Sequence, residues 1–195
     1  MDLNKMRFPT SSLIMGQRKS RPLDDYFNIP LGKSLELKTT THVDGMDMVF
    51  NFTIKIVGNT DDWKQRIVTM AQSVIAQPPL PPSCNMQGEV VLKLGSSVQE
   101  TKYDGTTVEL FPFGRQARLV KGQTWDVITG QDRLRYKVMG IGELEVAGQV
   151  FKDVLTIQQI NGLQTTESFY APGWGMVQIT SRGIISMDMV VQKLS

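Results

Sequence analysis

Apolar and polar residues alternate along much of the chain, which is the pattern of strands that bury one face. The clearest stretch covers residues 46–57, and its apolar face carries Met46, Met48, Phe50, Phe52, Ile54 and Ile56. Residues 34–43 alternate in the same way just before it. Asp44-Gly45 separates the two stretches, and this dipeptide tolerates the positive φ angles of a tight turn. We therefore predict a β-hairpin made of residues 34–43 and 46–57.

Residues 61–76 break this alternation, because their apolar residues recur at spacings of three and four. Those residues are Trp63, Ile67, Met70, Ala71, Val74 and Ile75. The spacing favours an apolar stripe along a helix, and the carboxylates of Asp61 and Asp62 suit a helix N-terminus. We predict one short helix over about residues 61–76. A strand is the alternative, since the segment is rich in β-branched residues.

A proline-rich segment follows, with the sequence Pro78-Pro79-Leu80-Pro81-Pro82. Proline lacks the backbone N–H donor, so these residues fit neither the interior of a helix nor a central strand. We expect residues 78–82 to form an extended connector. A recognition motif of the SH3-ligand type is the alternative interpretation of such a segment.

Short alternating strands resume beyond Cys84 and continue to the end of the sequence. Asp104-Gly105 and Ala147-Gly148 mark hairpin turns between them. About eleven short strands at close spacing predict an all-β, mainly antiparallel fold. Its curved sheets would form a sandwich or an open barrel.

The length of 195 residues fits one domain. We predict a single β domain over residues 25–195, preceded by a flexible basic arm at residues 1–24. A weak internal repeat suggests that the domain has two related halves, residues 25–77 and 88–195, joined by the connector.

The composition argues against several kinds of functional site. His42 and Cys84 are the only residues of their kinds, so a structural zinc site or an internal disulfide framework is not available. The formal net charge is only +2, which argues against a strong nucleic-acid binder. No apolar stretch is long enough for a transmembrane helix, and none has the core of a signal peptide. We expect no metal, no cofactor, no nucleic-acid partner and no membrane span, and the compartment stays open.

Residues 170–177 read Tyr-Ala-Pro-Gly-Trp-Gly-Met-Val, and their proline and glycines predict a tight corner between two strands. This segment resembles the Tyr-Ala-Pro-Gly-Val-Gly-Leu-Val signature of bacterial β-rich domains of the TapB-like type. Residues 122–125 and 143–153 support the resemblance, and Trp174 departs from it. The resemblance implies a β fold. It also implies an exported location, periplasmic or at the cell surface, because relatives are exported or lipid-anchored. It implies no established activity.

Methionine is the most unusual feature of the composition, with 11 residues. Met46 and Met48, and likewise Met187 and Met189, lie on one face of their predicted strands. Three interpretations remain open: core packing, a Cu(I) site made of thioether sulfurs, and an adaptable apolar pocket. Trp174 is either a cover for the core or an exposed aromatic. The candidate ligand-binding residues are therefore Met46, Met48, Trp174, Met187 and Met189.

No catalytic set of residues is readable from the sequence. Glu143 and Glu145 share one strand face, but the apolar residues between them predict a solvated row. We therefore expect a non-catalytic β domain that binds an apolar ligand or serves as a structural or interaction module. Its partner would be a hydrophobic small molecule or another protein. The alternative is a hydrolase-like enzyme that uses Asp and Glu residues brought together by the fold.

Overall fold

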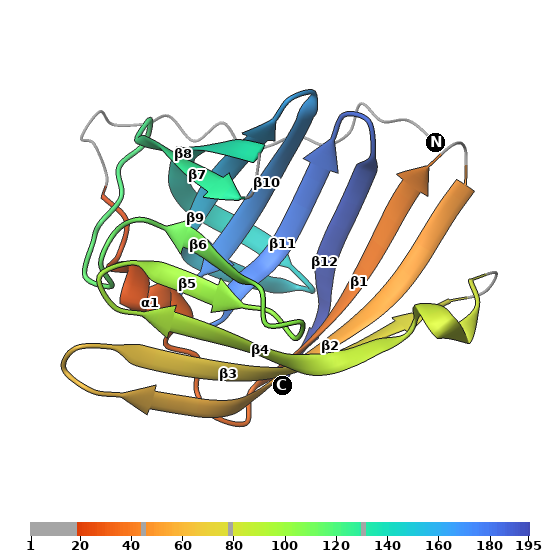
Figure 1. The fold of residues 1–195 in the computed structure, drawn as a ribbon, viewed down its shortest axis with the longest axis horizontal. Helices are drawn as coiled ribbons and strands as arrows, with labels where there is room; N and C mark the ends of the chain where they lie inside the picture. Colours follow the sequence, from red (N-terminus) through yellow and green to blue (C-terminus); the bar gives the residue numbers. More distant parts are fainter. Residues whose placement is uncertain (1–18, 44–45, 78–79, 130–131) are drawn as a thin grey trace.

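The computed structural model describes residues 19–43, 46–77, 80–129 and 132–195. These residues form twelve strands, one α-helix and one short 3-10 turn (Figure 1). The helix is α1 (Leu23–Phe27), and the turn is η2 (Pro82–Cys84). The strands are β1 (Ser34–Val43), β2 (Met46–Asp61), β3 (Arg66–Ala76), β4 (Met86–Leu94), β5 (Val98–Thr101), β6 (Thr107–Phe111), β7 (Thr124–Thr129), β8 (Asp132–Val146), β9 (Gln149–Asn161), β10 (Gln164–Ala171), β11 (Gly175–Arg182) and β12 (Ser186–Leu194).

All twelve described strands belong to one antiparallel sheet, in the order β6-β5-β4-β3-β2-β1-β12-β11-β10-β9-β8-β7. Strands from the two ends of the chain meet in its middle, where Thr39 of β1 lies opposite Met189 of β12. The edges of the sheet are β6 and β7, which follow one another in the sequence. The prediction of an all-β, mainly antiparallel fold is confirmed, and the architecture is that of an open barrel.

The barrel is nearly closed because β6 and β7 meet through their side chains. The indole Nε1 of Trp125 on β7 donates a hydrogen bond of 3.3 Å to the carbonyl oxygen of Leu110 on β6. The rings of Phe111 and Trp125 lie 5.5 Å apart between their centroids. We call this contact between β6 and β7 the seam.

The predicted helix over residues 61–76 is wrong. Residues 66–76 form β3, which pairs with β2 on one side and with β4 on the other. The carboxylate of Asp62 accepts hydrogen bonds from the backbone N–H groups of Lys64 and Gln65, at 2.7 and 2.8 Å. That acidic residue therefore stabilises a turn between β2 and β3 and does not cap a helix. The β-branched residues, which favoured the alternative, determine the outcome.

The predicted hairpins are confirmed. β1 and β2 pair antiparallel from Ser34 opposite Lys55 to Val43 opposite Met46, while the turn at residues 44–45 lies outside the described residues. Ala147 and Gly148 both have positive φ angles, of 52° and 73°, as a tight turn between β8 and β9 requires.

Residues 19–24 of the predicted basic arm lie within the described part of the chain. Residues 1–18 of the predicted arm at residues 1–24 lie outside the described residues. Leu23 is fully buried, and the backbone N–H of Ser20 donates to the carbonyl oxygen of Leu119 at 2.8 Å. Residues 19–24 are therefore part of the domain, where they pack along the segment between β6 and β7.

The proline-rich connector at residues 78–82 joins two adjacent strands, and residues 78–79 lie outside the described part of the chain. Ser73 of β3 lies opposite Gln87 of β4, so the sheet continues past the connector. The predicted halves at residues 25–77 and 88–195 consequently share one sheet. The described strands also form two six-stranded meanders, β1–β6 and β7–β12, which residues 112–123 connect.

Buried apolar residues form two clusters. The larger one is centred on aromatic rings of α1, the seam and β10, among them Phe27, Phe111 and Tyr170, whose centroids lie 5.6–6.0 Å apart. The smaller one contains Leu35, Leu37 and Val191 together with residues next to the turn of the β8–β9 hairpin, such as Phe151. The aromatic cluster and α1 close one end of the barrel.

Candidate ligand-binding site

The hydrogen-bond register determines which side chains share one face of the sheet, because residues directly opposite one another in paired strands point to the same side. Two rows of such residues cross the sheet. The first row is Met48, Thr41, Met187, Ser181, Thr166, Gln159, Tyr136 and Trp125. The second row is Ala76, Phe50, Thr39, Met189, Ile179, Ser168, Ile157 and Val138.

Both rows lie on the inner face of the barrel. Trp125 and Tyr136 of the first row stack with an interplanar angle of 6°, and Trp125 also contacts Phe111 of the buried aromatic cluster. In the second row Ile157 is 3% exposed and Val138 is fully buried. The inner face is therefore tightly packed on the side of β8 and β9.

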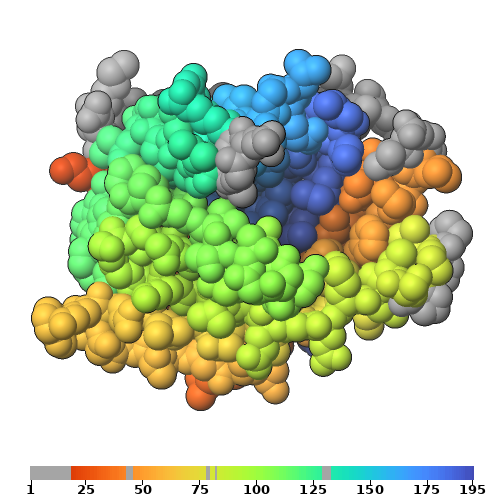
Figure 2. All heavy atoms as spheres, in the orientation of Figure 1, coloured from red at the N-terminus to blue at the C-terminus, as the bar shows by residue number. Residues whose placement is uncertain are grey.

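Towards β2, β11 and β12 several apolar side chains of the same rows are more exposed, although Thr39 and Ser181 between them are buried. Met48, Phe50, Met187, Met189 and Ile179 are only half-buried although they are apolar and face inward. Figure 2 shows a hollow in this region, with β11, β12 and β1 behind it and the green strands β5 and β6 in front. Solvent therefore reaches an apolar inner surface on this side of the barrel.

The hollow lies towards one end of the barrel, which we call the open end. The C-terminal ends of β1, β3, β5, β7, β9 and β11 lie at this end, together with the N-terminal ends of the strands that follow them. Among the described residues, most of the large apolar side chains that are exposed lie at these strand ends or in the short links beside them. They are Met46, Ile75, Met86, Tyr103, Ile128, Ile160, Leu163, Ile184 and Ile185. These side chains make the strand ends at the open end apolar, although Ile75, Ile128 and Ile160 point to the outer face of the sheet.

A buried hydroxyl and a partly buried carboxyl lie on the inner face. Thr39 is 3% exposed, and its hydroxyl has no hydrogen-bond partner among the described residues. Glu100 of β5 lies opposite Leu92, and burial raises the pKa of its carboxyl. The charge of Glu100 also contributes to the raised pKa values of the Tyr136 and Tyr170 hydroxyls, for which burial is the larger cause. Thr39 and Glu100 are thus polar groups on the otherwise largely apolar inner face.

The raised pKa of Glu100 gives a prediction about stability and pH. At neutral pH the folded state holds a carboxylate whose charged form is penalised by burial, and below the unfolded-state pKa of about 4.3 this penalty disappears. Glu100→Gln should therefore raise the melting temperature at neutral pH, and the gain should vanish in acid. Thermal unfolding across this pH range measures it, with the exposed Glu89→Gln as the control. A gain that grows as the pH falls would contradict the assignment.

The structure brings three of the five predicted ligand-binding residues together. Met48 and Met187 both lie opposite Thr41, and Met189 lies in the adjacent row. Met46 lies at the open end and is 65% exposed. Trp174 lies at the other end of the barrel, where its ring packs against Phe151. The ammonium nitrogen of Lys33 lies over the same ring, 3.5 Å from its centroid.

Several inner-face residues were not among the predicted ligand-binding residues. The alternation of residues 46–57 placed Phe50 on the same apolar face as Met48, but Phe50 was not included in the predicted site. Thr39, Ile179 and Glu100 come from three other strands, and only the pairing of the strands places them beside the methionines.

Other candidate residues do not assemble into a site. No group of three or more His, Cys, Asp or Glu side chains suited to a metal ion occurs within residues 19–43, 46–77, 80–129 and 132–195. His42 contacts Asp47 at the surface of the β1–β2 hairpin. Glu143 and Glu145 are exposed on β8, while Leu144 packs against the smaller core cluster. No helix within the described ranges has the length and hydropathy needed to cross a membrane.

Comparisons with known proteins give the fold only. No family model matches the chain, and no curated protein does. One similar solved structure is a protein of Bacteroides fragilis, assigned as exported and having a YmcC-like fold, with a TM-score of 0.59 and 9% identity over 86% of this chain and 97% of that one. Another is a protein of Parabacteroides distasonis assigned as a lipoprotein, with a TM-score of 0.52 and 10% identity over 92% of this chain and all of that one. The chain therefore shares its fold with these proteins, and the resemblance to TapB-like domains stays a prediction.

Proposed function

We propose that this protein is a non-catalytic carrier or sensor that binds an apolar small molecule at the open end of its barrel. The observation that carries the proposal is the row of half-buried apolar side chains on the inner face, centred on Met48, Met187 and Met189. Pockets for small molecules are mostly apolar and contain a few polar groups that orient the ligand. The unpartnered hydroxyl of Thr39 is such a group.

Methionine suits this role because its side chain is flexible and polarisable, so it adapts to ligands of different shape. Phe50 and Ile179 supply more rigid apolar area beside the thioethers.

The enzyme alternative receives less support from the carboxylates that the fold brings together. Asp24 and Asp61 lie close to one another, but both form ion pairs with Arg66 and Arg115 at 2.6–3.0 Å. Carboxylates that are held in this way are neutralised by their partners and are poor acid–base or nucleophilic groups. An exported location is the second part of the proposal, and the two similar structures of exported and lipoprotein type support it.

A fluorescence titration with 1-aminoanthracene tests the binding proposal, because this neutral apolar dye brightens in apolar sites. We expect saturable binding with one site and a Kd of about 1–10 μM. Met187→Glu and Met189→Glu should each weaken binding at least ~10-fold, because they place a charge on the apolar inner face.

Val150→Glu is the matched control, since Val150 is an apolar residue on β9 that is 54% exposed and lies away from the open end. It should bind the dye as the unsubstituted protein does. Absence of saturable binding, or equal affinity in folded Met187→Glu and Val150→Glu proteins, would contradict the proposal.

A further inference from the structure

We propose a second binding site, for an uncharged oligosaccharide, in a groove at the end of the barrel opposite the open end. Two adjoining surface hollows, of about 470 and 350 Å³, form this groove, and both are lined by Asp62 and Lys64. The groove extends from the segment between β6 and β7, across the β2–β3 turn, to the loop between β4 and β5.

The groove displays an almost fully exposed tryptophan. Trp63 lies in the β2–β3 turn and is 87% exposed, which no packing role of this residue explains. The ammonium of Lys64 lies over one face of the indole, 4.7 Å from the ring centroid. The other face is open to solvent. An exposed flat indole face binds the C–H face of a sugar ring through apolar contact and through the negative potential of the aromatic face.

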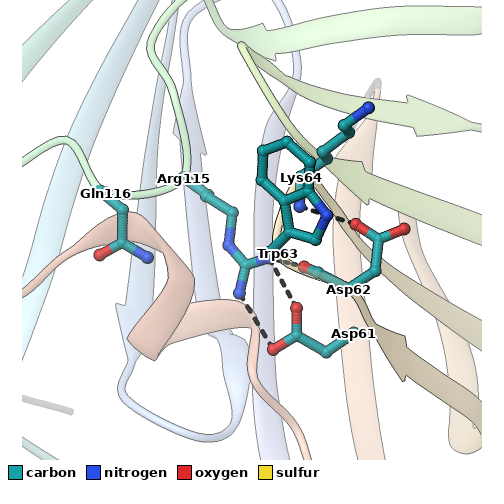
Figure 3. Close-up of a pocket in the computed structure, with 6 residues that line it drawn as sticks. All are labelled: Asp61, Asp62, Trp63, Lys64, Arg115 and Gln116. Atoms are coloured by element: carbon teal, nitrogen blue, oxygen red, sulfur yellow. Dashed lines mark hydrogen bonds and ion pairs between the residues drawn. The ribbon is translucent and has the colours of Figure 1, made fainter.

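Ion pairs fix the polar side chains that line the groove beside Trp63. The Arg115 guanidinium donates to both carboxylate oxygens of Asp61, at 2.6 and 3.1 Å, and to the backbone carbonyl of Asp62 at 3.0 Å. Arg115 also holds the pKa of the Asp61 carboxyl below its usual range, so this group stays an acceptor. Figure 3 shows the indole of Trp63 and the amide of Gln116 on either side of the guanidinium. The polar groups are thus preorganised, which lowers the entropic cost of binding.

The charge balance favours an uncharged ligand. Among the lining residues, Lys64, Lys93 and Arg115 are positive while Asp61 and Asp62 are negative, so the net charge is only +1. Most of the remaining lining side chains are neutral hydrogen-bonding groups, namely Gln65, Ser96, Ser97, Gln99 and Gln116. Hydroxyls and primary amides beside an aromatic platform match a molecule whose surface alternates hydroxyl groups with C–H faces. Because two hollows adjoin, the ligand is a chain of sugars and not a single one.

Calorimetric and tryptophan-fluorescence titrations with uncharged hexasaccharides test this site, using maltohexaose, cellohexaose, chitohexaose and mannohexaose as probes. We expect at least one of them to bind with a Kd of about 1 mM or tighter. Trp63→Ala should weaken that binding about 30-fold, as truncation of a tryptophan anchor does, and Trp63→Phe should have a smaller effect. Gln116→Ala should weaken it as well.

Leu31→Ala is the control, because Leu31 is 68% exposed and does not line the groove. Binding of 1-aminoanthracene should be unchanged in Trp63→Ala, so the failure of one site is distinguishable from the failure of the other. Absence of binding across the four probes, or equal affinity in folded Trp63→Ala, would overturn the proposal. Tighter, salt-dependent binding of hexagalacturonate would also overturn it, because that result assigns the groove to an anion.

Discussion

Replacing Arg66 with alanine should lower the free energy of unfolding by about 3–5 kcal/mol, because it leaves a buried carboxylate without its main partner. The Arg66 side chain is 9% exposed and donates two hydrogen bonds to Asp24, at 2.9 and 3.2 Å. It also donates to Asp61, Asn28 and Asn59, at 2.7–3.1 Å. This one guanidinium therefore connects α1 with the end of β2.

Chemical denaturation monitored by circular dichroism measures the loss for Arg66→Ala. The control is Arg133→Ala, since Arg133 belongs to an ion pair in which its own side chain is 68% exposed. Exposed pairs contribute little to stability, so this control should change it only slightly. Equal effects of the two substitutions would show that the Arg66 network does not hold α1 against the barrel.

Phe111→Ala should also cost about 3–5 kcal/mol, the range observed when a buried phenylalanine is truncated and leaves a cavity. Phe111 is 2% exposed and contacts three rings from separate elements: Phe27 of α1, Trp125 of β7 and Tyr170 of β10. It is also the last residue of β6, so it holds this edge of the sheet against β7. We expect the seam to loosen and the emission of Trp125 to move to longer wavelength.

Equilibrium denaturation with urea gives the stability of Phe111→Ala, and tryptophan emission before the transition reports on the seam. Leu163→Ala is the control, because Leu163 is 82% exposed at the open end and its truncation creates no cavity. A loss below ~1 kcal/mol for Phe111→Ala would show that the aromatic cluster does not close the barrel.

The strands of this fold could be predicted because each buries one face. β1 and β2 follow a strict two-residue period, and the dipeptides at their turns tolerate positive φ angles. β3 was mistaken for a helix because the apolar Ile67 and Ile75 point outward while the charged Arg66 points inward, so the apolar residues recur at spacings of three and four. Its burial depends on carboxylates from α1 and β2, and no local pattern reveals that partnership.

The candidate site was only partly predictable for a related reason. Met48 and Met187 are separated by most of the chain, and they approach one another only because β1 pairs with both β2 and β12. Alternation shows that each methionine faces inward but not which strands are neighbours. For Trp174 the local structure was predicted correctly, because Gly173 and Gly175 form the expected tight corner. Its position, away from the open end and against the smaller core cluster, depends on how the strands pair.

The most direct test of the central claim is an NMR titration of protein labelled with methyl-¹³C methionine. Adding 1-aminoanthracene should shift the methyl signals of Met48, Met187 and Met189, assigned through single Met→Leu variants. The signal of Met70, which is 8% exposed and belongs to the larger core cluster, should stay in place and serves as the internal control. If the dye shifts none of the three signals, or only those of methionines away from the inner face of the open end, the account is contradicted.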